Sequence, residues 1–246
     1  MTDMQTGNAP LTPRAALTLG PVLFNWSAER KRDFYFRMAD EAPVDVVYVG
    51  EVVCSKRTPF LTPVLPDIIE RLTAAGKEVV ISTLALIMTD KESTSVREIA
   101  EAPGLMVEAN DFATADMLAG RPHVIGPCVN IYNEGSLGFL ADRGANRVCL
   151  PVELPGDAVR QLAGLNICDI ETQVWGRLPL AISARCYHAR AHGLHKDGCQ
   201  YVCDLDPDGM DVTTLDEQPF LTVNGTQTMS STCLNLVGEI NDLATS

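Results

Sequence analysis

Three cysteines lie close together between Cys186 and Cys203, in a stretch that also holds three histidines. Twelve residues separate Cys186 from Cys199, and three separate Cys199 from Cys203. Few apolar side chains are available here to build a core, so a bound metal would supply the order that packing cannot. Thiolates favour zinc or an iron–sulfur cluster, and either usually takes four ligands.

The fourth ligand has to come from another part of the chain, and Cys54 is the best candidate. It follows an apolar run that is typical of a strand, and Lys56 and Arg57 come directly after it. Positive charge favours the thiolate, which is the form that binds a metal. A lone cysteine after a strand is nevertheless more often a small buried apolar residue than a ligand. Spacing alone therefore leaves Cys128 and Cys233 open as alternatives, and we expect the late segment around Cys233 to be helical.

The remaining cysteines and the histidines have simpler interpretations. Cys149 and Cys168 fall in apolar strand patterns, so we expect both to be structural thiols. Zinc can combine two histidines with two cysteines, but we prefer a solvated basic loop as the interpretation of His188, His192 and His195. No G-x-S-x-G or H-E-x-x-H motif occurs, so the standard hydrolase signatures are absent.

Four glutamates, found at or near predicted strand ends, offer another chemistry. They could act as acids or bases, or could equally pair with arginines such as Arg57, Arg147 and Arg185. These glutamates are Glu51, Glu108, Glu153 and Glu171.

Composition restricts the class of protein and the compartment. The net charge of −13 argues against binding to nucleic acid or to an anionic membrane surface. The first ten residues lack the features of a signal peptide, and no apolar stretch reaches the length of a membrane span. We therefore expect a cytoplasmic protein without an integral membrane segment, in which eight cysteines are ligands or core residues rather than disulfides.

Short apolar runs alternate with helical patterns along most of the chain. The alternation predicts a parallel sheet, and its regular spacing favours a TIM-barrel-like (β/α) barrel in one domain over residues 14–246, after a flexible tail at residues 1–13. The predicted strands are 16–24, 44–49, 78–82, 105–108, 123–126, 147–150 and 167–175, and the predicted helices are 27–41, 66–75, 92–100, 111–118, 134–143 and 157–163.

The barrel prediction bears on the cysteines, because barrel active sites collect on the loops after the carboxyl ends of the strands. Cys54 follows the second predicted strand, and the segment from Cys186 to Cys203 follows the seventh. Strands two and seven would lie near each other around a closed ring. We therefore expect a cysteine-rich segment at the barrel mouth, with Cys54 close to it.

Three stretches resemble the collagenase-like peptidase family, and within it the branch that acts in ubiquinone biosynthesis. They are GEVVCSKR at 50–57, DIETQVWGRLPLAISARCY at 169–187 and NGTQTMS at 224–230. The similarity begins near Leu17 and covers almost the whole chain. The resemblance implies a 4Fe–4S cluster held by Cys54, Cys186, Cys199 and Cys203, with the histidines as non-ligands.

The resemblance also implies a function and a partner. The chain would be the iron–sulfur subunit of an enzyme complex that hydroxylates the ubiquinone ring without oxygen, acting as a heterodimer with a UbiU-like protein. A lipid-binding accessory protein would carry the quinone precursor. Members of this family usually continue further, so we expect an incomplete barrel at the carboxyl-terminal end. A collagenase-like peptidase and a zinc-stabilised, non-catalytic binding subunit remain as alternatives.

Overall fold

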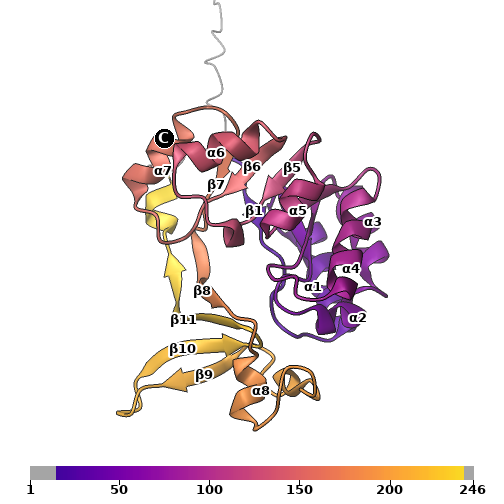
Figure 1. Cartoon of the computed structure of the whole chain (residues 1–246), viewed down its shortest axis with the longest axis vertical. Helices are drawn as coiled ribbons and strands as arrows, with labels where there is room; N and C mark the ends of the chain where they lie inside the picture. Colours follow the sequence, from indigo (N-terminus) through magenta and orange to yellow (C-terminus); the bar gives the residue numbers. More distant parts are fainter. Residues whose placement is uncertain (1–14, 241–246) are drawn as a thin grey trace, which may run out of the picture.

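A seven-stranded parallel sheet forms the larger part of the molecule, which the computed structural model describes over residues 15–240 (Figure 1). Its strands follow one another in chain order, and every neighbouring pair is parallel. The strands are β1 (Thr18–Leu19), β2 (Val46–Gly50), β3 (Glu78–Ser82), β4 (Met106–Ala109), β5 (His123–Ile125), β6 (Ala145–Cys149) and β7 (Asp169–Glu171). The predicted tail at residues 1–13 lies outside the described part.

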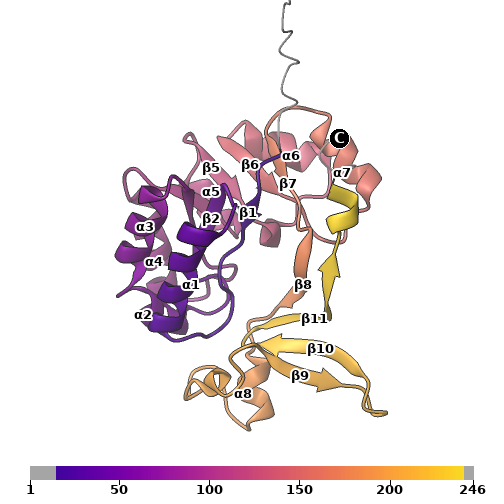
Figure 2. The same cartoon turned by 180° about the vertical axis from the view of Figure 1, so that it is seen from behind.

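Helices follow the strands and cover the outer side of the curled sheet, as the two opposite views in Figures 1 and 2 show. They are α1 (Ala28–Glu41), α2 (Thr58–Leu61), α3 (Leu65–Ala74), α4 (Asp90–Glu101), α5 (Phe112–Met117), α6 (Glu134–Ala141) and α7 (Gly156–Ala163). Local sequence sets where several of them begin. Ser27 accepts a hydrogen bond from the backbone N–H of Arg30, and Asp111 accepts one from Thr114, as expected of helix N-caps.

The strand β2 shows how the layers are built. Val47 and Val49 face outward and pack in one core cluster with Ile68 of α3. Val46 and Tyr48 alternate with them and pack instead with valines of other strands inside the sheet. This alternation is the period-two pattern of a strand buried on both faces.

The sheet curls until its two edges approach each other. Thr18 of β1 and Tyr48 of β2 both donate hydrogen bonds to the carboxylate of Glu171 on β7, each at 2.6 Å. The predicted α/β fold is therefore confirmed as an incomplete, TIM-barrel-like arrangement of seven parallel strands.

A second, antiparallel sheet was not predicted from the sequence. Its order is β8–β11–β10–β9, and it stands away from the barrel in both views (Figures 1 and 2). The predicted strand 167–175 is in fact split between the two sheets. The strands of this second sheet are β8 (Trp175–Ile182), β9 (Met210–Thr213), β10 (Pro219–Asn224) and β11 (Gln227–Asn235).

The segment around Cys233 was predicted to be helical, and this prediction is wrong. Cys233 lies in β11, opposite Arg177 of β8. Pairing with β8 decides its conformation, while β10 pairs with β11 only over residues 227–230. Short helical segments complete the description: α8 (Tyr187–Ala191) and the 3-10 helices η1 (Ser55–Arg57), η2 (Pro127–Val129), η3 (Val202–Asp204) and η4 (Val237–Glu239).

Among residues 15–240, no helix is both long enough and apolar enough to cross a bilayer.

Candidate metal centre

The four cysteines predicted as ligands line a single pocket between the barrel and the second sheet. Cys54 comes from the loop after β2, Cys186 caps the start of α8, Cys199 follows α8 and Cys203 lies in η3. Neither of the alternative fourth ligands considered from the sequence lines this pocket. The structure thus brings the predicted set together, and its role as a ligand set stays a prediction.

The spacing of the sulfur atoms has a bearing on what the pocket can hold. Among residues 15–240, no three of the cysteine sulfur atoms all lie within 4.8 Å of one another. The only group of potential ligand atoms in this part of the chain that is this compact contains no cysteine. A tetrahedral zinc site with bonds of about 2.3 Å places its sulfur atoms about 3.8 Å apart. A 4Fe–4S cluster is also held by four cysteines and is larger than one ion, which suits a wider spacing.

Two of the sulfur atoms accept hydrogen bonds from N–H groups. The backbone N–H of Ala189 donates to Sγ of Cys186 at 3.4 Å, and the side-chain amide of Asn25 donates to Sγ of Cys203 at 3.3 Å. Donors of this kind stabilise a thiolate and adjust the potential of a cluster bound to it. The four thiols, with the N–H groups that bond to two of them, therefore fit a metal group that is held by thiolates.

Burial and charge act in opposite directions on the pocket thiols. Burial is the larger effect and raises the pKa of both Cys54 and Cys186, whereas the nearby Arg57 guanidinium lowers each pKa. The backbone N–H of Lys56 also lowers the pKa of Cys54. A metal would bind these two thiols by displacing their protons, so its binding should release protons to the solvent.

Arg57 connects the cysteine loop of the barrel to the second sheet. Its side chain is 1% exposed, and its two terminal nitrogens donate to the backbone carbonyl of Leu23 and to Oδ1 of Asn224, each at 2.9 Å. Its charge also acts on the thiols of Cys54 and Cys203. The sequence predicted a cation beside Cys54 but gave no indication of this bridging role.

The turn between β10 and β11 fits against this arginine. Gly225 has a φ of +65°, and a Cβ atom on it would lie 2.7 Å from Nη2 of Arg57, so a larger residue would clash. Thr226 donates its hydroxyl hydrogen to the carbonyl of Val53 at 2.8 Å, and the carbonyl of Gly225 accepts from the N–H of His188. The turn therefore contacts both segments that carry the cysteines.

Glu51 orients the loop that carries Cys54. Its Oε1 accepts hydrogen bonds from the backbone N–H groups of Val53 and Cys54, at 3.1 and 3.0 Å. Its Oε2 lies 3.8 Å from the ammonium group of the buried Lys31. Burial raises the pKa of Glu51, and the charges of Arg57 and Lys31 counteract this effect. Glu51 is thus a positioning residue for the cysteine loop.

A lysine holds the turn that passes beside the pocket. The ammonium group of Lys56 donates to the backbone carbonyls of Lys196 and Asp197, both at 2.6 Å. Lys196 itself lines the pocket together with Lys56 and Arg57. Three cationic side chains therefore surround four thiols, an arrangement that favours negative charge on a bound group.

Three of the cysteines outside the pocket occupy barrel positions, and the fourth, Cys233, lies in β11 of the second sheet. Cys149 ends β6, and Cys168 packs against the larger core cluster just before β7. Burial, together with the nearby Glu108, raises the pKa of the Cys128 thiol to about 12. Burial also raises the pKa of Glu108, to about 7.

The other glutamates singled out from the sequence make local contacts. Glu153 accepts a hydrogen bond from Tyr132, and Arg147 pairs with Glu78 at 3.2 Å rather than with one of the four glutamates singled out from the sequence. The interpretation of the histidines as a solvated loop holds for His192 and His195, which are exposed. It is wrong for His188, which is 0% exposed.

Sequence reasoning missed three polar residues that organise the site. Asn25 bonds to Cys203, Asn224 bonds to Arg57, and Thr226 bonds to Val53 in the loop that carries Cys54. The dipeptide Asn224–Gly225 is a hairpin signal that could have located the turn. Nothing local marks Asn25, because its partner lies 178 positions away in the chain.

The sequence model of Peptidase family U32 matches residues 33–246, a range that includes every pocket cysteine. No solved structure matches the chain.

Proposed function

The chain belongs to peptidase family U32, and we propose that it is a UbiV-like, iron–sulfur subunit of an oxygen-independent hydroxylase in ubiquinone biosynthesis, acting with a UbiU-like partner. The observation that carries the proposal is the pocket itself. Four thiols from distant parts of the chain line it together with Lys56, Arg57 and Lys196. Family membership alone does not assign an activity.

The pocket favours a cluster over a single zinc ion for two reasons. The sulfur atoms do not gather within the 4.8 Å that brings ligands around one ion. Hydrogen-bond donors from Ala189 and Asn25 reach two of them, as is usual for thiolates that hold a redox cluster. The ubiquinone substrate and the UbiU-like partner rest on the motifs GEVVCSKR and C-x12-C-x3-C.

The chain's residues would bind, orient and shield the cluster. Cys54, Cys186, Cys199 and Cys203 would hold it, and the cluster would carry electrons when bound. Arg57 would offset negative charge beneath it. Glu51 would keep the Cys54 loop in place through its bonds to the backbone.

Peptidase activity has weaker support from the thiols. A cysteine nucleophile needs a lowered pKa, whereas burial raises the pKa of Cys54, Cys128 and Cys186. The chain also lacks the serine and zinc motifs of standard hydrolases.

Anaerobic purification and reconstitution test the cluster directly. We expect about four irons and four sulfides per chain, from the composition of the cluster, together with an EPR signal in one accessible oxidation state. Zinc in place of iron would favour a structural binding subunit, and a metal-free protein that cleaves peptides would favour the peptidase.

A genetic experiment tests the pathway. Deleting the gene should abolish ubiquinone made without oxygen and leave aerobic synthesis unchanged. The wild-type gene should restore anaerobic synthesis, and a Cys199→Ala variant should not. Normal anaerobic ubiquinone in the deletion strain, with no functional duplicate present, would refute the assignment.

A further inference from the structure

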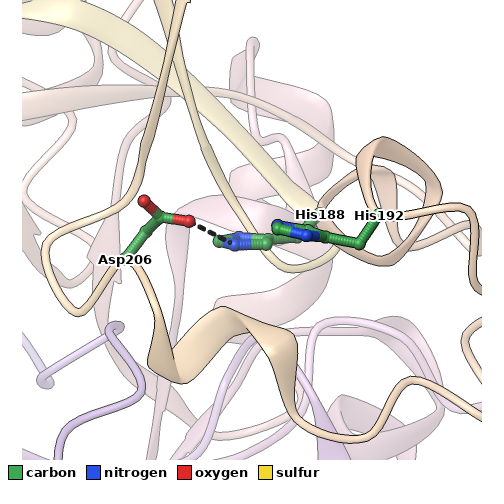
Figure 3. Close-up of side chains that lie close together, drawn as sticks. All are labelled: His188, His192 and Asp206. Atoms are coloured by element: carbon green, nitrogen blue, oxygen red, sulfur yellow. Dashed lines mark hydrogen bonds and ion pairs between the residues drawn. The ribbon is translucent and has the colours of Figure 1, made fainter.

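Three side chains beside the cysteine pocket lie close together (Figure 3). His188, His192 and Asp206 each offer a potential ligand atom, and these atoms all lie within 4.8 Å of one another. The two imidazole rings are nearly parallel, with 12° between their planes and 5.8 Å between their centroids. None of the three residues lines the cysteine pocket.

Short-range structure explains why these side chains meet. His188 lies in α8 and His192 directly follows it, so their i, i+4 spacing places them on one face. Asp206 follows η3, which packs against α8. Its Oδ2 lies 2.8 Å from Nε2 of His188 (Figure 3).

His188 is fully buried, and its Nε2 lies against Asp206 while its other ring nitrogen, Nδ1, has no hydrogen-bond partner among the described residues. Buried polar atoms in folded proteins normally have partners, and an exception calls for an explanation. Packing alone does not explain a buried imidazole that faces a second imidazole and a carboxylate.

We propose that His188, His192 and Asp206 bind a divalent transition-metal ion at a site separate from the cysteine pocket. Two imidazoles and one carboxylate suit zinc and ferrous iron, and three protein ligands leave a position open for water or a small molecule. Two ligands of a tetrahedral zinc, with bonds of about 2.0–2.1 Å, lie about 3.3 Å apart. The separation of 2.8 Å between His188 and Asp206 therefore needs to widen by only about half an ångström when zinc replaces the shared proton.

Zinc binding to the cluster-loaded protein tests the proposal. The protein is prepared anaerobically without a histidine tag and titrated with zinc chloride in a calorimeter. We expect one zinc per chain beyond the cluster. X-ray absorption at the zinc edge should show only nitrogen and oxygen ligands, near about 2.0–2.1 Å, and no sulfur near about 2.3 Å.

Three residues of the same segment provide the variants and their control. His192→Ala and Asp206→Asn should each weaken zinc binding by more than about tenfold, because each removes a ligand. His195→Ala is the matched control, since His195 is an exposed histidine three residues away, and it should bind zinc as the wild type does. Zinc bound through sulfur, no bound zinc, or equal affinity in His192→Ala would each overturn the proposal. If the protein takes up no cluster on reconstitution but still binds zinc through His188, His192 and Asp206, this inference stands and only the proposed function is refuted.

Discussion

Replacing Arg57 with methionine should destabilise the fold and empty the cysteine pocket. Methionine approximates the length of the arginine side chain but keeps neither its charge nor its hydrogen-bond donors. The substitution would remove the bonds to the carbonyl of Leu23 and to Oδ1 of Asn224. It would also remove a positive charge that acts on the buried Glu51.

The size of the effect follows from what each partner would lose. The carbonyl of Leu23 would keep a partner, because it also accepts from Nδ2 of Asn224 at 2.8 Å. Oδ1 of Asn224 would lose its donor, at a cost of about 1–3 kcal/mol for a buried acceptor. Glu51 would lose one of two neighbouring cations, and removing one partner of a buried charge pair costs about 3–5 kcal/mol. Since these costs overlap, we expect a loss of about 3–5 kcal/mol in the free energy of unfolding.

Urea unfolding of the reconstituted protein, followed by circular dichroism, measures this loss. Iron per chain, determined on the same samples, reports on the pocket. Arg71→Met is the matched control, because Arg71 forms an exposed ion pair with Asp40 at 2.8 Å. Exposed pairs contribute little, so this control should keep both its stability and its iron.

A milder variant keeps the test informative if Arg57→Met fails to fold. Arg57→Lys retains the charge but loses the planar guanidinium group, whose two terminal nitrogens reach two acceptors at once. We expect an intermediate loss of stability and partial iron content. A change below about 1 kcal/mol in Arg57→Met, with full iron content, would refute the view that Arg57 ties the barrel to the second sheet.

Three further predictions concern the ligands, one buried acid and the partner. Cys54→Ala should lose most of the iron and Cys168→Ala should keep it, since only Cys54 lines the pocket; full iron in Cys54→Ala would remove it from the ligand set. Burial raises the pKa of Glu108 from 4.5 to about 7, so the folded state holds a proton that the unfolded state releases between these pH values. Stability should therefore fall as pH rises through this window, by roughly 3 kcal/mol, and urea unfolding of Glu108→Gln should show a shallower pH dependence than the wild type; identical slopes would contradict this. Co-expression with a UbiU-like protein should give a heterodimer in size-exclusion chromatography, and two separate peaks would count against that partner.

Local patterns predicted the barrel well because local forces determine it. The strand expected at 78–82 is β3 as observed, and the helix expected after Ser27 begins there because that side chain caps it. The burial of β2 on both faces also follows from its continuous apolar run. The four pocket cysteines were grouped on the expectation that parallel strands end at one mouth, but in the structure only Cys54 follows a barrel strand, and the other three follow β8 of the second sheet.

Contacts between distant segments account for what was missed. The strand β8 contains Gly176 and Pro179, and its pairing with β11 shifts register, so its sequence lacks a regular strand pattern. The burial of His188 depends on residues that follow it by up to 18 positions, including Asp206. Arg57 bonds to a residue 167 positions away. No window of neighbouring residues contains such information.

The two sheets meet at the pocket, and this arrangement gives a bound group a structural role as well as a chemical one. The barrel supplies Cys54, while the segment between β8 and β9 supplies the other three cysteines. Without a bound group, Arg57 and the turn at Gly225 are prominent among the contacts that join these parts, along with the bond from Thr226 to Val53. A group bonded to all four thiols would close a loop of more than 100 residues, which restricts the unfolded chain more than a short loop does. The metal and the arginine would therefore act on the same junction, and loss of either should weaken the hold of the second sheet on the barrel.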